Sequence, residues 1–114
     1  MRLEKDLYTY LWRDPYENNC NTYVIQEEMT ILIDPGHTRH LKKVFHQMEE
    51  DGLSPDKIDL VIVTHSHPDH MEGVEVFLDK PVRIAMGQEE ERYLLESGKI
   101  LFEMMGMPLP KTRI

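Results

Sequence analysis

The chain has little cysteine, no long apolar segment and fewer basic than acidic side chains. Its one cysteine, Cys20, cannot form a disulfide within the chain, which argues against a disulfide-stapled secreted scaffold. No apolar stretch approaches the length of a membrane span. Residues 1–6 contain acids where an export signal needs a basic start followed by an apolar run. We therefore expect a cytoplasmic protein with no membrane association.

The shortage of basic residues also restricts the partners. Lys and Arg number 13 against 21 Asp and Glu, giving a net charge of -8, which opposes the phosphate neutralisation that drives nucleic-acid binding. With 114 residues, 40% hydrophobic and 30% charged, the chain fits one modest folded domain spanning residues 1–114. A small-molecule substrate is therefore favoured over a nucleic acid.

Three β-rich segments are predicted in the first third of the chain. They are Leu7–Trp12, Asn21–Ile25 and Thr30–Ile33. The polar residues 26–28 between the second and third segments indicate a hairpin. The sequence Asp34-Pro35-Gly36 then predicts a turn in which Gly36 supplies a positive φ.

An amphipathic helix is predicted to begin near Thr38 as N-cap and to stop at Gly52. Its apolar stripe, with the spacing i, i+3, i+4 and i+7, consists of Leu41, Val44, Phe45 and Met48. The opposite face includes His40 and His46, which we expect to be solvated. His37 is also assigned to the surface, although its place after the turn could bring it near the strand ends.

The rest of the chain alternates strands and helices. Strands are predicted at Asp56–Val63 and Val82–Met86, and helices at Met71–Leu78 and Gln88–Leu95. The continuous apolar run Leu60–Val63 suggests burial on both faces of the sheet. The order β-β-β-α-β-α-β-α indicates an α/β layer with helices packed on the sheet.

The densest chemical signal is Thr-His-Ser-His-Pro-Asp-His at residues 64–70, directly after that apolar run. Imidazole and carboxylate are the ligand types that suit zinc and its neighbours. In an extended segment His65 and His67 point to the same side and can share one ion. Pro68 then turns the chain, so that Asp69 and His70 can face a second ion about 3.5 to 4 Å away, with a water between the two ions.

Two other interpretations of the motif are weaker. Ordinary loop residues rarely gather in this spacing after a buried strand. A purely structural zinc site usually has four ligands and is rich in cysteine, whereas this one has no cysteine nearby and a carboxylate suited to an open site. We expect Cys20 to be a half-buried small residue rather than a reactive thiol, because no base stands beside it.

The order of these features resembles the N-terminal half of the metallo-β-lactamase superfamily, including glyoxalase II-like hydrolases. The matching features are the hairpin and turn over residues 21–36, the helix from Thr38, the strand Lys57–Val63, the motif at 64–70 and Gly73. The resemblance implies an α/β fold, namely the N-terminal half of an αββα sandwich with a mixed sheet and flanking helices.

The resemblance also implies roles for the motif residues. His65 and His67 would bind the first metal, and Asp69 and His70 the second. Asp69 would be the catalytic residue that helps to activate the bridging water, so that hydrolysis proceeds by a metal-bound hydroxide. Asp34 matches a position that supports the site from beneath, with a plain turn residue as the alternative.

Two positions of the motif bear on the branch of the family. Histidine at His67 points away from the flavodiiron-type branch, which has Glu there, and favours a zinc hydrolase, with iron or manganese as alternatives. Glu72 precedes Gly73 where the family often has a pair of glycines, a mild departure. The substrate cannot be identified from these residues.

No histidine follows His70, whereas family members continue through a second His, a bridging Asp and a final His. Catalytic zinc normally has three protein ligands, and this motif offers two for each ion. Three hypotheses follow: a truncated portion of a zinc hydrolase, a subunit completed by a complementary chain or a symmetric copy, or a non-catalytic remnant. A half-fold should expose one apolar sheet face.

Overall fold

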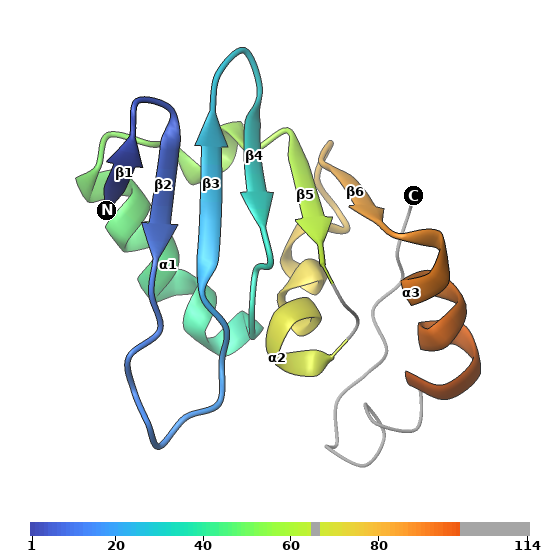
Figure 1. Cartoon of the computed structure of the whole chain (residues 1–114). Helices are drawn as coiled ribbons and strands as arrows, with labels where there is room; N and C mark the ends of the chain where they lie inside the picture. Colours follow the sequence, from blue (N-terminus) through green and yellow to red (C-terminus); the bar gives the residue numbers. More distant parts are fainter. Residues whose placement is uncertain (65–66, 99–114) are drawn as a thin grey trace.

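The computed structural model describes residues 1–64 and 67–98. Its strands form one six-stranded sheet in the order β1-β2-β3-β4-β5-β6 (Figure 1). They are β1 (Arg2–Glu4), β2 (Leu7–Tyr10), β3 (Thr22–Gln26), β4 (Thr30–Ile33), β5 (Leu60–Val63) and β6 (Arg83–Met86). The first four strands pair antiparallel, and β5 joins β4 and β6 in parallel, so the sheet is mixed as predicted. The short edge strand β1 was not predicted.

The helical elements follow the predicted order with shorter pieces. They are α1 (Thr38–Glu50), η1 (Pro55–Lys57), α2 (Pro68–Met71), η2 (Glu72–Phe77), α3 (Gln88–Tyr93) and η3 (Leu94–Gly98). The helix predicted over 71–78 is instead mostly the 3-10 helix η2. The strand predicted from Asp56 begins only at Leu60, because Pro55 starts a 3-10 turn. No helix in the described ranges is long and apolar enough to cross a membrane.

Helix α1 confirms the clearest sequence pattern. Leu41, Val44 and Met48 are buried on its inner face. The helix ends in a Schellman motif, in which Gly52 has φ +82 and its N–H donates to the carbonyl of Glu49 at 3.0 Å. The N–H of Leu53 donates to the carbonyl of Met48 at 2.9 Å, and both of these side chains are buried. The predicted stop at Gly52 is therefore correct.

Among the described residues, the helices cover one face of the sheet and leave the other open. In Figure 1, α1 lies behind the strands and α2 lies below the end of β5, and no helix of residues 1–64 or 67–98 crosses the face towards the viewer. Burial alternates along β4 and β5, so that Leu32 and Val61 are fully buried towards the helices. The alternate residues Ile31 and Leu60 pair across the strands and are only half-buried. The burial of β5 on both faces is thus not reached within the described chain.

Two histidines predicted to lie on the surface are instead covered by other residues. His37 is 1% exposed, and His40 is half-buried, with its ring centroid 4.3 Å from that of Trp12. The loop after β2 folds over the start of α1, where Glu17 pairs with Arg39 at 3.0 Å. This cover comes from a distant segment, so helix periodicity could not predict it. His46 is exposed, as predicted.

Candidate metal centre

The strand ends bring two separated turns to the same edge of the sheet. Because β4 and β5 run parallel, the residues after each of them, Asp34 and Thr64, emerge side by side. The N–H of Asp34 continues the ladder by donating to the carbonyl of Ile62 at 2.9 Å. Asp34 itself has φ 58, a left-handed conformation that Asp tolerates better than most residues. Its side chain is thereby directed at the segment after β5.

The carboxylate of Asp34 contacts both Thr64 and His70. Its Oδ1 accepts the Thr64 N–H at 2.8 Å, and its Oδ2 accepts the Thr64 hydroxyl at 2.6 Å. The same Oδ2 lies 3.1 Å from Nδ1 of His70. The side chain is buried, at 6% exposure. Asp34 is therefore a supporting residue beneath the motif as well as a turn residue.

This contact fixes the orientation of the His70 ring. A carboxylate that accepts the Nδ1–H of histidine sets the tautomer and directs Nε2 to a metal, the usual arrangement around metal-bound imidazoles. His70 Nε2 lies 3.8 Å from Oδ2 of Asp69, and both side chains are about a quarter exposed. Two tetrahedral ligands with bonds of about 2.0 to 2.1 Å to zinc lie about 3.4 Å apart. The donor pair thus fits one shared ion with a small adjustment.

The other predicted ligands are less fully described. His67 is exposed and precedes α2, and its carbonyl accepts the N–H of His70 at 2.9 Å and of Met71 at 3.0 Å. His65 lies outside the described residues. Within residues 1–64 and 67–98, no group of three or more ligand side chains comes together. The structure therefore places Asp69, His70 and their support, and the full predicted set stays a prediction.

Two glycines let the motif pack directly on the turn after β4. Gly36, at φ +74, donates its N–H to the carbonyl of His70 at 3.1 Å, and Gly73 donates its N–H to the carbonyl of Gly36 at 2.5 Å. A Cβ placed on Gly73 would lie 2.6 Å from that carbonyl oxygen. The positive φ predicted at Gly36 is confirmed, and Gly73 is required by close backbone approach.

Cys20 lies behind the same turn. Its Sγ is 3.5 Å from the carbonyl oxygen of Asp34, which also accepts the hydroxyl of Thr22 at 2.7 Å. Burial, together with the nearby charges of Asp34 and Asp69, raises the pKa of the Cys20 thiol to about 12. The thiol is therefore protonated at neutral pH, in agreement with the prediction that it is not reactive, although Cys20 is buried rather than half-buried.

We expect Cys20 to react very slowly with a thiol reagent. A pKa raised from 9.0 to about 12 reduces the thiolate population at pH 8 by roughly a thousandfold. Labelling with an aromatic disulfide reagent at pH 8 should be at least about a hundredfold slower in the native chain than in urea. Equal rates in the two conditions would contradict this burial.

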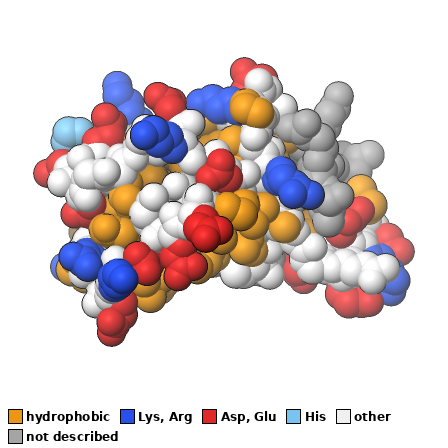
Figure 2. Space-filling view, turned by 90° about the horizontal axis from the view of Figure 1, so that it is seen from above, with side chains coloured by type: hydrophobic (Ala, Val, Ile, Leu, Met, Phe, Trp, Pro, Cys, Tyr) orange, Lys and Arg blue, Asp and Glu red, His pale blue; other side chains and the backbone are white. Residues whose placement is uncertain are grey.

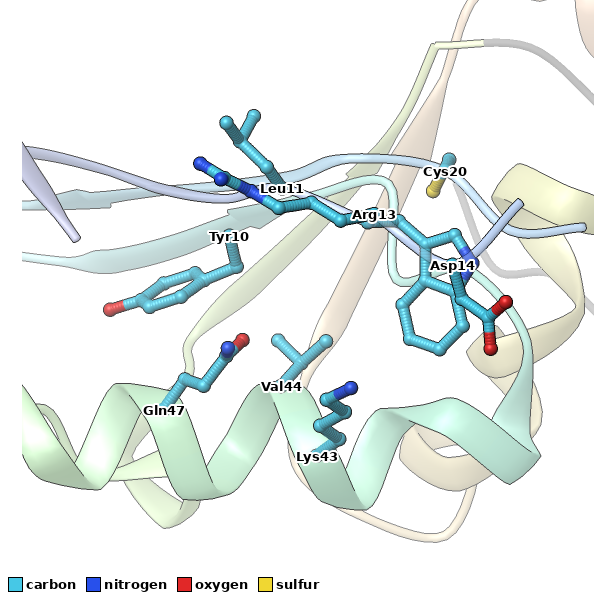
Figure 3. A pocket seen from close by; sticks show the side chains of 9 residues that line it. Tyr10, Leu11, Arg13, Asp14, Cys20, Lys43, Val44 and Gln47 are labelled. Atoms are coloured by element: carbon cyan, nitrogen blue, oxygen red, sulfur yellow. The ribbon is translucent and has the colours of Figure 1, made fainter. Parts of the chain in front are cut away.

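A pocket of about 350 Å³ lies elsewhere, between α1 and the segment after β2 (Figure 3). Figure 3 shows Tyr10, Val44, Lys43 and Gln47 around it, with Cys20 at the far end. Lys43 Nζ lies 5.2 Å from the ring centroid of Trp12, which also lines the pocket. None of the described motif residues lines this pocket. We therefore do not assign it to the metal chemistry.

Comparisons with known proteins agree with this architecture. A model of the metallo-beta-lactamase superfamily matches residues 15–113. The FEZ-1 metallo-beta-lactamase from Legionella gormanii has a TM-score of 0.68 at 17% identity, covering 83% of this chain and 39% of that one. A metallo-beta-lactamase from Cronobacter sakazakii has a TM-score of 0.62 at 20% identity, covering 86% of this chain and 40% of that one. The chain belongs to the metallo-beta-lactamase superfamily, a family of metal-binding hydrolases, and corresponds to its N-terminal portion.

Individual relatives have names that indicate different activities. A probable metallo-hydrolase of Methanocaldococcus jannaschii is 38% identical over 86 residues, which is 73% of this chain and 39% of that protein. The anti-Pycsar protein Apyc1 of Paenibacillus harenae is 40% identical over 62 residues, 54% of this chain and 23% of that protein. The exodeoxyribonuclease WalJ of Streptococcus pneumoniae is 28% identical over 79 residues, 69% of this chain and 29% of that protein. The chain spans two fifths or less of these relatives.

Proposed function

We propose that the chain carries the N-terminal part of a dinuclear zinc hydrolase centre. The observation that carries this proposal is the arrangement in which Asp34 holds Nδ1 of His70 while Nε2 lies 3.8 Å from Asp69. A carboxylate beside the second ring nitrogen is the usual arrangement around a metal-bound histidine. Imidazole and carboxylate donors fit zinc, with iron and manganese as alternatives.

The roles of the residues follow from this arrangement. His65 and His67 bind the first ion, and Asp69 and His70 bind the second. Zinc held by these residues would lower the pKa of water towards neutrality and so supply the nucleophile for hydrolysis. Asp69 would orient that water and take up its proton. Asp34 keeps the His70 imidazole in the tautomer and orientation that ligation needs.

The open sheet face favours completion by further polypeptide. The described donors do not form a group of three, and Ile31, Leu60 and their neighbours leave an apolar sheet face half-buried. The second half of the family domain, a complementary chain or a second copy would cover this face and supply ligands. A remnant that binds metal without catalysis is the alternative, and it differs by lacking hydrolysis even after such completion.

Membership of the family does not identify the substrate. The relatives named above include an exodeoxyribonuclease and an anti-Pycsar protein, and a glyoxalase II-like activity is equally a proposal. The net charge of -8 favours a small molecule over a nucleic acid, and a cytoplasmic setting fits the single cysteine. Candidate thioester, lactone and phosphoester substrates should be tested only on protein that holds metal.

The proposal is tested by metal binding. Zinc and iron per chain are measured by elemental analysis, and zinc affinity by competition with a chromophoric chelator. We expect weak zinc binding by the chain alone, lowered at least about tenfold in His67→Ala and His65→Ala, with near two zinc ions per chain once the site is completed. Asp69→Ala should abolish hydrolysis by the completed protein with little loss of secondary structure.

His46→Ala is the matched control, because His46 is exposed on α1 and pairs only with Glu50 of the same helix in the described structure. It should bind zinc as the wild type does. Unchanged zinc binding in both motif variants would refute the ligand assignment.

A further inference from the structure

The start of α1 and the loop that carries the metal ligands are joined on both backbone and side chains. On the backbone, the N–H of Gly36 donates to the carbonyl of His70, and the carbonyl of Gly36 accepts the N–H of Gly73. The side-chain part comes from Glu72, whose Oε1 accepts the N–H of Thr38 at 3.2 Å. Glu72 Oε2 accepts the hydroxyl of Thr38 in a short hydrogen bond. We call this set of contacts the Glu72 clamp.

Glu72 serves as the cap that α1 lacks in its own sequence. The first N–H groups of a helix have no partner within it, and they favour a negative group. His37 occupies the N-cap position and provides no side-chain cap. The predicted cap, Thr38, is instead the first helical residue, and its own N–H and hydroxyl are both received by Glu72. The capping carboxylate therefore comes from 34 residues further along the chain.

The Glu72 carboxylate is also enclosed by the buried side chain of His37. The Glu72 side chain is 14% exposed, and Nδ1 of the buried His37 lies 3.5 Å from its Oε1. A carboxylate that contacts two neighbours has few rotamers left. It therefore holds its own backbone at a more fixed distance from those neighbours than a mobile side chain would. Glu72 is two residues after His70, on a 3-10 helix whose own hydrogen bonding is poor. The clamp is thus well placed to set where His70 lies.

We propose that Glu72 is a positioning residue for the metal centre, acting by holding the His70 loop against the first turn of α1. This inference rests on the proposed function, since His70 must be a ligand for its position to matter. Glu72 stands at the position where the motif often has glycine, and a glycine has no side chain with which to form the clamp. The clamp is therefore a feature of this chain beyond the ligand motif.

Four variants distinguish a positioning role of Glu72 from an effect of its charge and from a loss of folding. Glu72→Asp keeps the charge but is one methylene shorter, Glu72→Gln keeps the reach but loses the charge, and Glu72→Gly removes the side-chain part of the clamp. Glu75→Gln, on the same 3-10 helix, is the control for a lost charge. The readouts are zinc affinity by chelator competition, the visible spectrum of the cobalt-loaded chain, and amide exchange of Thr38 and Gly73 in the metal-free chain.

We expect Glu72→Gly and Glu72→Asp to bind zinc about tenfold more weakly than the wild type, with altered cobalt bands, while Glu75→Gln stays within about twofold. Exchange at Thr38 and Gly73 should be about tenfold faster in Glu72→Gly. Glu72→Gln should lie between the wild type and Glu72→Gly. Loss of affinity in Glu72→Gln and Glu75→Gln alike, with Glu72→Asp unaffected, would overturn positioning in favour of charge alone.

Failure of the proposed function has a different signature. If the wild type binds no zinc, the proposed function is wrong, and the amide exchange still decides whether the clamp exists. Unchanged exchange in Glu72→Gly would overturn the clamp itself. Wild-type zinc affinity and cobalt bands in Glu72→Gly would overturn the positioning role while leaving the proposed function intact.

Discussion

Replacement of Asp34 by alanine is expected to destabilise the chain by about 2 to 3 kcal/mol, because it removes three part-buried hydrogen bonds of a charged side chain. The Thr64 N–H, the Thr64 hydroxyl and Nδ1 of His70 all lie within 3.1 Å of this carboxylate. Alanine also tolerates φ 58 less well than Asp does. Urea unfolding of the metal-free chain measures the change. The same variant should lose about 10 to 100-fold in zinc affinity, because the imidazole of His70 is no longer oriented.

Asp56→Ala is the matched control for this carboxylate. Asp56 is exposed in η1, so its replacement should change the free energy of unfolding by no more than about 0.5 kcal/mol. Asp34→Asn, which keeps the shape and tolerates the left-handed backbone, should lie between the two. An Asp34→Ala variant as stable as Asp56→Ala would show that the hydrogen bonds of Asp34 contribute nothing to folding.

Gly73→Ala is expected to destabilise the chain by about 2 to 4 kcal/mol, because the added Cβ has no room. It would lie 2.6 Å from the carbonyl oxygen of Gly36 and 3.1 Å from Cβ of Pro35. Both neighbours belong to the tight turn after β4, so they cannot give way as the end of a flexible side chain would. The turn and the motif must separate, which also weakens the bond from Gly73 to Gly36.

Gly87→Ala provides the comparison, because a Cβ there meets no atom within 4 Å. Its φ of -62 is also ordinary for any residue. The two variants are compared by thermal and urea unfolding, and Gly87→Ala should be within about 0.5 kcal/mol of the wild type. Equal stability of the two variants would mean that the close approach at Gly73 is relieved without cost.

Local patterns account for the parts of the fold that were predicted correctly. The stripe Leu41 to Met48 and the stop at Gly52 depend only on helix periodicity and on the left-handed conformation at a helix end. The hairpin of β3 and β4 follows from alternating strand formers around a polar turn. Both signals lie within about a dozen residues, so a single sequence reveals them.

Contacts between distant segments account for what was missed. His37 and His40 were assigned to the surface, but the loop after β2 and the residue Glu72 cover them. The 3-10 turn at Pro55 shortens β5, and the edge strand β1 forms because β2 is there to pair with it. Each of these depends on a neighbour that the local sequence does not contain.

The sequence by itself determined the α/β class, the helix α1, and a motif whose residue types can bind metal, because spacing and side-chain chemistry are local properties. Only the tertiary structure decided that Asp34 reaches His70 and that Glu72 caps α1. These pairs lie 36 and 34 residues apart. Their contacts exist because the parallel pairing of β4 and β5 brings both turns to one edge of the sheet, an arrangement that no stretch of sequence encodes locally.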